Sequence, residues 1–128
     1  MAMSRRLREQ VEADLRLYPR LSARLAKLIN ELSEEELAQN DEYRRGVLIV
    51  EAVRRLREKS DDRHNYIMEV YFWHEQPAEE VARLMGLQPQ AIEWVARQII
   101  RRLHQEFRRV GLDPYTEEDG NNPQAQSV

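Results

Sequence analysis

The stretch EEVARLMGLQPQAIEWVARQII, from Glu79 to Ile100, contains two helical patterns that are interrupted by one glycine. The first pattern is short and ends at Met85, and the second begins near Pro89 and continues past Ile100. Gly86 lies between them, where a left-handed backbone would close the first helix just before the second begins. The stretch therefore predicts either a helix-turn-helix, which sets its second helix into a DNA groove, or a plain helical corner in a small bundle.

The spacing of small and apolar residues in this stretch favours the helix-turn-helix. Counted from Ala78, the fifth place holds Ala82, and a small residue is needed there because the two helices approach closely. The ninth place holds Gly86. The places that join the two helices are all apolar: Val81, Met85, Leu87, Ile92 and Val95. Helical corners with glycine are nevertheless common, so the pattern alone leaves both interpretations open.

Positive charge is concentrated along the second helix of the pattern. Residues 76–110 contain six arginines and four glutamates, whereas the whole chain has a net charge of −3. Any affinity for nucleic acid must therefore come from this local distribution. The six arginines are Arg83, Arg97, Arg101, Arg102, Arg108 and Arg109.

The composition predicts an all-α protein. The 128 residues are enough for one domain with appendages, and glycine is scarce while Leu, Arg, Glu and Ala dominate. The lack of cysteine excludes disulfides, thiolate metal sites and a cysteine nucleophile. No apolar run resembles a secretory signal or a membrane span, so we expect a cytoplasmic protein without a membrane partner.

Two amphipathic helices are expected in the N-terminal part. The first covers Arg5 to Tyr18, and after Pro19 a second covers roughly Arg20 to Leu32. The second helix carries a leucine stripe, made of Leu21, Leu25, Leu28 and Leu32. A stripe this apolar must pack against the body of the protein or against a second chain, and we expect a homo-oligomer.

The middle of the chain is expected to be helical after a linker. Ser33 could cap a helical turn, but the acidic stretch from Glu34 to Glu42 is expected to be a partly ordered linker. The run Val47 to Val50 would fit a buried strand, although the apolar residues that follow indicate a helix from Arg44 to Ser60.

Further cap signals define the C-terminal part. Asp61 is a suitable N-cap for the next helix, and Pro77 is expected in the first turn of the helix that follows it. The tail after Gly111 has little to bury and is expected to be disordered. The expected organisation is N-terminal helices and linker over residues 1–42, a DNA-binding domain over 43–110, and the tail over 111–128.

At this point a resemblance to known families is visible. The segment from Asp61 to Phe107 resembles the C-terminal, promoter-reading domain of bacterial sigma factors, with Tyr66 to Trp73 in the place of its aliphatic-aromatic helix and EEVARLMGLQPQAI in the place of its helix-turn-helix. Together with the Tyr18-Pro19 step, the leucine stripe and the charged linker, the layout from Arg5 to Val110 looks like the ArpU/RinA family of phage late-gene transcriptional regulators.

The resemblance implies a helical bundle with a sigma-like helix-turn-helix and a long last helix. It implies an activator of prophage late operons in the bacterial host cell that binds double-stranded DNA, has no enzymatic activity or cofactor, and has RNA polymerase as a second partner. The chain departs from the pattern at Pro77, where threonine is usual, at Gln88, where serine usually caps the reading helix, and at Glu93 and Trp94, where basic or small polar residues are more conventional.

The candidate DNA-binding residues lie on the second helix of the motif. Base contacts are expected from Gln88, Gln90, and Glu93 or Trp94, because glutamine can bond adenine bidentately and an apolar ring can touch a thymine methyl. Phosphate contacts are expected from the arginines, namely Arg97, Arg101 and Arg102. Each also has a plainer interpretation: a solvated helix start, a solvated arginine face and, for Trp94, packing against another helix or a second subunit.

Other chemistries find little support in the sequence. The three histidines, His64, His74 and His104, lack metal-ligand spacing, and nothing converges on the acidic run Glu34 to Glu36. No glycine-rich phosphate loop is present, so no catalytic residue, cofactor or metal is expected. Two alternatives to the regulator remain: a small DNA-packaging (terminase) recognition subunit, which would form large rings, and a helical protein-interaction module that does not bind DNA.

Overall fold

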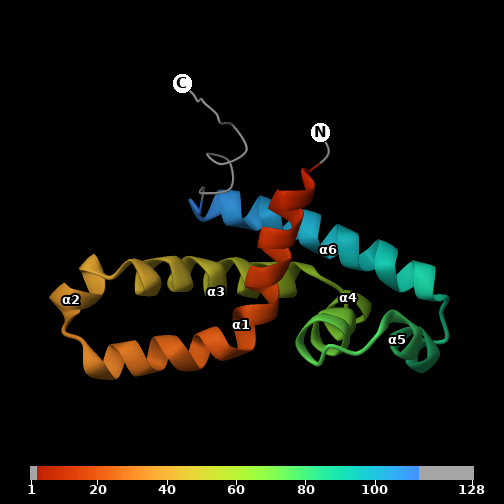
Figure 1. Cartoon of the computed structure of the whole chain (residues 1–128), viewed down its shortest axis with the longest axis horizontal. Helices are drawn as coiled ribbons and strands as arrows, with labels where there is room; N and C mark the ends of the chain where they lie inside the picture. Colours follow the sequence, from red (N-terminus) through yellow and green to blue (C-terminus); the bar gives the residue numbers. More distant parts are fainter. Residues whose placement is uncertain (1–2, 113–128) are drawn as a thin grey trace.

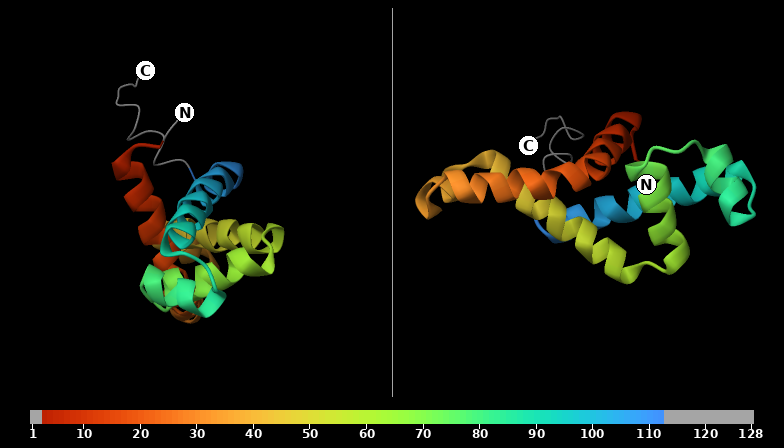
Figure 2. Two further views of the ribbon diagram at one scale, coloured as in Figure 1. Left: turned by 90° about the vertical axis from the view of Figure 1, so that its right-hand side faces the viewer. Right: turned by 90° about the horizontal axis from the view of Figure 1, so that it is seen from below.

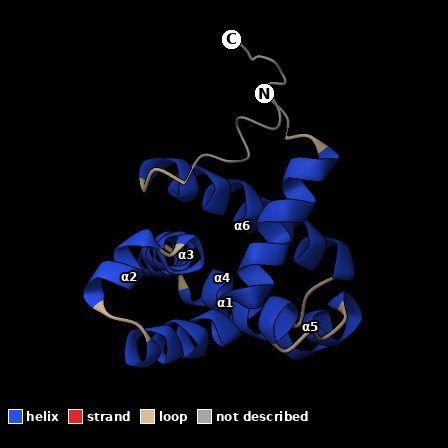
Figure 3. Ribbon diagram, turned by 60° about the vertical axis from the view of Figure 1, so that its left-hand side comes forward, coloured by secondary structure: helices blue, strands red, loops and turns tan. Residues whose placement is uncertain are grey.

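The computed structural model describes residues 3–112, and these residues form helices and no strand, which confirms the all-α prediction (Figure 1 and Figure 3). The helices follow the cap signals of the sequence: the Asp61 side chain accepts a hydrogen bond from the His64 N–H at 2.8 Å, and residues 47–50 are helical. In chain order the segments are α1 (Arg5–Glu31), α2 (Glu34–Gln39), α3 (Asp41–Lys59), α4 (Asp62–Ile67), the π-helical turn η1 (Met68–Trp73), α5 (Ala78–Met85) and α6 (Pro89–Arg109).

Helix α1 continues through Pro19, so the prediction of two separate helices is wrong. Proline has no N–H for the carbonyl of Leu15 one turn earlier, which normally breaks or kinks a helix. Here the indole Nε1–H of Trp73 donates to that carbonyl at 2.8 Å, and the Tyr18 and Trp73 rings stack with centroids 5.1 Å apart. Figure 1 shows the result, a single helix that bends sharply.

The half of α1 after the bend pairs with α3 and forms, with α2 at its end, an arm of the molecule (Figure 1 and Figure 2). The leucine stripe faces α3, where a Cβ on Gly46 would lie 2.7 Å from Leu25 Cδ2. Only glycine lets the two helices approach this closely without displacing that leucine. The stripe is therefore covered by the chain's own α3 and does not require a second subunit.

Helix α2 replaces the partly ordered linker that the acidic stretch predicted, and that prediction is wrong. Ser33 and Glu36 form a reciprocal capping box, in which each side chain accepts a hydrogen bond from the other residue's backbone N–H, at 3.1 and 2.8 Å. The Asn40 side chain then caps α3 by accepting from the Tyr43 N–H at 2.8 Å. These local bonds satisfy the free N–H groups of both helices, so the short α2 forms although none of its residues is buried.

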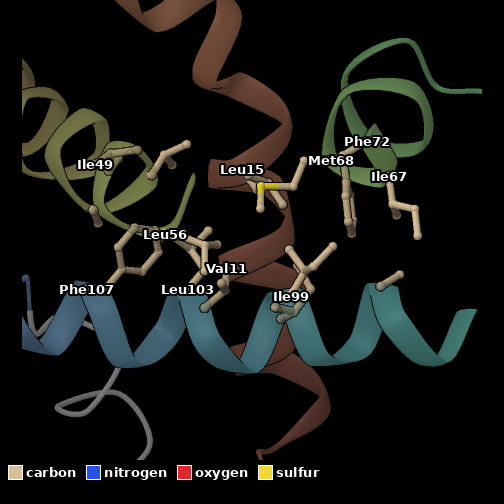
Figure 4. Close-up of a cluster of buried hydrophobic side chains, with 14 of the residues drawn as sticks. Val11, Leu15, Ile49, Leu56, Ile67, Met68, Phe72, Ile99, Leu103 and Phe107 are labelled. Atoms are coloured by element: carbon tan, nitrogen blue, oxygen red, sulfur yellow. The ribbon is translucent and has the colours of Figure 1, made fainter. Parts of the chain in front are cut away.

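One hydrophobic core joins the N-terminal half of α1 to α3, η1 and α6 (Figure 4). The boundary expected between residues 42 and 43 lies inside α3, and the core spans it. The labelled core residues in Figure 4 are Val11, Leu15, Ile49, Leu56, Ile67, Met68, Phe72, Ile99, Leu103 and Phe107. Because α1 crosses α6 in this core, the N-terminus of the chain lies beside the last helix.

The C-terminal end of α6 is more ordered than expected. Gly111 has φ +86° and Leu112 is buried, with its N–H bonded to the Phe107 carbonyl at 2.8 Å. The predicted tail therefore does not begin at Gly111, because a glycine followed by leucine closes the helix and packs the leucine on the core. The rest of the predicted tail, residues 113–128, lies outside the described residues.

Candidate nucleic-acid interface

A left-handed glycine forms the corner between α5 and α6. Gly86 has φ 69°, as the sequence predicts. The Leu87 N–H bonds the Ala82 carbonyl at 2.9 Å and the Gly86 N–H bonds the Arg83 carbonyl at 3.4 Å, which is the paired arrangement of a Schellman cap. Pro77 is the N-cap residue of α5 and not part of its first turn, as the sequence analysis had expected, whereas Pro89 does begin α6.

The apolar places of the motif hold the two helices together. Ala82, Ile92 and Val95 are buried, as is Val81. Met85 and Leu87 are partly buried and pack against the same core. The corner is thus a fixed unit that presents the first turns of α6 at one end of the molecule, next to α5 (Figure 1).

Replacing Gly86 by valine is expected to destabilise the protein by more than about 1 kcal/mol, because a β-branched residue resists a positive φ. A Cβ at this position would meet no atom within 4 Å, so the cost comes from the backbone alone. Gly86→Asn is the matched control, since asparagine tolerates this conformation and should cost less. Thermal melts of the three proteins compare the costs; equal melting temperatures for valine and glycine would contradict the prediction.

One exposed stripe runs along α6. Gln90, Trp94, Arg97, Arg101 and Arg108 are exposed and follow one another at spacings of three, four or seven residues, so they share a helix face. Gln88, at the N-cap, is also exposed, and its side chain makes no capping bond. Polar and aromatic side chains thus come first and cations later along this face.

The arginines of the stripe are not held by carboxylates. Within residues 3–112, no ion pair is formed by Arg97, Arg101 or Arg108. Neighbouring arginines behave differently, since Arg83 pairs with Glu80 and Arg109 pairs with the buried Glu106. The stripe therefore presents positive charge that is available to an external anion.

Glu93 and Arg102 lie off this stripe. Glu93 faces the flank that α6 shares with α1 and η1, where burial raises the pKa of Tyr71, with contributions from the nearby carboxylates of Glu12, Glu93 and Glu79. Arg102 is half-buried and its Nη2 donates to the Lys59 carbonyl at 3.4 Å, toward α3. The structure thus brings together five of the seven predicted residues, Gln88, Gln90, Trp94, Arg97 and Arg101, on one exposed side.

Trp94 does not pack against another helix of the chain. Its residue is 54% exposed, and it makes no ring contact or hydrogen bond within the described residues. Of the interpretations that the sequence left open, packing inside the monomer is therefore wrong.

Arg8 is a residue of this face that the sequence analysis missed. It lines, with Arg97 and Tyr71, a pocket of about 290 Å³ between α1, η1 and α6. Arg8 is exposed and forms no ion pair with residues 3–112. The basic run Arg5, Arg6 and Arg8 was the available signal, but only the crossing of α1 over α6 brings Arg8 beside Arg97.

Other kinds of site find no support in the described residues. Residues 3–112 hold no cluster of three or more potential metal ligands, and none of their helices combines the length and hydrophobicity of a membrane span. His64 lies 2.7 Å from Asp61 at the start of α4, where it belongs to the helix cap.

Comparisons with known proteins add no relatives: no family model matches the chain, and neither the curated proteins nor the solved structures contain a match.

Proposed function

We propose that this protein is a sequence-specific DNA-binding transcriptional regulator that inserts the first turns of α6 into the major groove. The observation that carries the proposal is the exposed stripe of α6, where unpaired arginines follow exposed polar and aromatic side chains behind a fixed glycine corner. This is the order that a recognition helix needs, with base contacts near its N-terminus and phosphate contacts around them.

The mechanism is positional. Gln88 and Gln90 contact base edges, and Arg97 and Arg101 neutralise phosphates and fix the register on the duplex. Arg8 adds a cation from α1 beside Arg97. Glu93 lies among carboxylates, so the DNA approaches from the other flank of α6, because phosphates are repelled by that acidic surface.

Activation of phage late genes and contact with RNA polymerase are the finer parts of the proposal, and they rest on the resemblance stated above. A homo-oligomer that reads paired half-sites also stays a prediction. The leucine stripe does not support it, since α3 covers that stripe. Exposed Trp94 is the observation that favours the rival, a protein-interaction module.

Base contacts and phosphate contacts can be separated by two substitutions. After the preferred site has been selected from random duplexes, Gln90→Ala is expected to weaken binding to that site by about 1–3 kcal/mol and to change binding to random DNA little. Arg101→Ala is expected to weaken both similarly and to make the salt slope about one unit shallower. Binding isotherms at several salt concentrations measure both effects.

Arg20→Ala is the matched control, because Arg20 is an exposed arginine on the arm and forms no ion pair within residues 3–112. It should leave affinity and salt slope unchanged. If Gln90→Ala and Arg101→Ala behave like Arg20→Ala at every salt concentration, α6 does not lie in the groove. The interaction-module alternative then gains.

A further inference from the structure

Trp94 has the largest exposed fraction among the large apolar side chains that the structure leaves exposed in residues 3–112. The second tryptophan is different: Trp73 stacks on Tyr18, lies under the Arg57 guanidinium and donates to the Leu15 carbonyl. An indole has a large apolar area whose burial is favourable, so its exposure at the centre of the α6 stripe indicates a ligand surface that covers it.

The position of Trp94 on α6 identifies the chemistry of that surface. It lies one helical turn after Gln90 and one turn before Arg97 and Arg101, with which it shares the exposed face. A ring between a base-reading amide and phosphate-binding cations is directed at base edges if α6 lies in the major groove. Thymine presents a methyl group there, and this methyl is the apolar feature that the other bases lack.

We propose that Trp94 determines specificity by packing its indole ring on the 5-methyl group of a thymine in the major groove. The inference rests on the proposed function and deepens it. Four residues of helix advance the contact by about 6 Å from Gln90. Because base pairs follow each other at about 3.4 Å, the thymine lies about two base pairs from the base that Gln90 contacts.

Uracil tests this contact because it differs from thymine by the methyl group alone. The full chain is measured on its selected duplex and on duplexes in which each thymine in turn is replaced by uracil. At one position the affinity of the unmodified protein is expected to fall about fourfold, the effect of one methyl group returned to water. Trp94→Ala is expected to bind the thymine duplex more weakly and to bind the thymine and uracil duplexes equally.

Leu84→Ala is the matched control, since Leu84 is exposed on α5 and should leave the thymine preference unchanged. Fluorescence gives a second measurement, because the chain has two tryptophans. Binding should quench the unmodified protein, whereas Trp94→Phe, which retains only Trp73, should show no change. Thermal melts of the Trp94 variants should match the unmodified protein, because the side chain supports no internal contact.

The outcomes distinguish this inference from the proposed function. If the protein prefers a sequence but no uracil substitution separates it from Trp94→Ala, the thymine contact is wrong and the DNA-binding proposal stands. If Trp94→Ala instead changes the molecular mass in solution and leaves DNA binding intact, the ring belongs to a protein interface and the inference is overturned. If no duplex is preferred over random DNA, the proposed function fails, and the inference fails with it.

Discussion

Replacing Trp73 by alanine is expected to lower the free energy of unfolding by about 3 kcal/mol, the low end for an aromatic truncation because Trp73 is only partly buried. The substitution removes three contacts at once: the stack on Tyr18, the cation–π contact with Arg57 and the bond to the Leu15 carbonyl. Chemical denaturation measures the change. A loss below about 1 kcal/mol would mean that the bend of α1 is stable without η1.

The bond to Leu15 can be isolated with a double-mutant cycle. Trp73→Phe keeps a ring for the stack but removes the N–H, and it is expected to cost about 1–3 kcal/mol because a buried carbonyl is left without a donor. In a Pro19→Ala background the alanine N–H can bond the same carbonyl, so Trp73→Phe should cost about 1 kcal/mol less there. Equal costs in the two backgrounds would show that Trp73 does not compensate for the proline.

Replacing Glu106 by glutamine is expected to cost about 3 kcal/mol, because it leaves three cations around a buried site without their anion. The Glu106 side chain is 3% exposed and accepts from Arg55 Nε at 3.1 Å, Lys59 Nζ at 2.8 Å and Arg109 Nη1 at 2.6 Å. The cations themselves are partly exposed, which keeps the cost at the low end for a broken buried pair. Glu58→Gln, in an exposed pair with Arg54, is the matched control and should cost less than about 1 kcal/mol.

The same carboxylate predicts an acid limb of stability. Burial raises the pKa of Glu106, but the hydrogen bonds from Lys59 and Arg55 and the charges of Lys59 and Arg109 outweigh it and lower the pKa below 4.5. Its stabilisation is therefore present above pH 4.5 and is lost as the pH falls through the lowered pKa. Glu106→Gln should show a shallower loss of stability below pH 4.5, and an unchanged acid limb would contradict the assignment.

Asp14 changes stability in the opposite direction at higher pH. Burial raises the pKa of Asp14 to about 6, against the opposing effect of its ion pair with Arg45. The native state therefore takes up this proton first, and stability rises as the pH falls from about 6 to 3.8. Because Asp14 is present in both proteins, its contribution cancels when Glu106→Gln is compared with the unmodified chain at each pH.

The features that the sequence predicted correctly depend on local rules. The positive φ of Gly86 and the cap at Asp61 follow from one residue and its neighbours, and the helical continuation of α3 follows from its apolar spacing. Ser33 and Glu36 also carried a local signal for α2, but the acidic composition outweighed it in the prediction.

The features that the sequence did not predict depend on distant partners. Pro19 looks like a helix break until the donor for the Leu15 carbonyl, Trp73, is known, and that donor is 58 residues away. Glu106 was counted as a surface charge, and its burial depends on Arg55 and Lys59 of another helix. At the candidate interface the periodicity identified α6, but the separation of Arg102 from Arg101 needed the position of α3.

The π-helical turn η1 has a consequence for insertions and deletions. Its wider turn, with the His74 N–H bonded to the Glu69 carbonyl five residues earlier at 2.9 Å, accommodates one residue more than an α-helix of the same path. Deleting a single residue from Met68–Trp73 would restore the α-helical repeat but rotate everything that follows by about 100°. Trp73 would then leave the Leu15 carbonyl, and α5 and α6 would lose their alignment with α1. The length of this segment is thus constrained to the single residue, although most of its side chains could be replaced by others of similar shape.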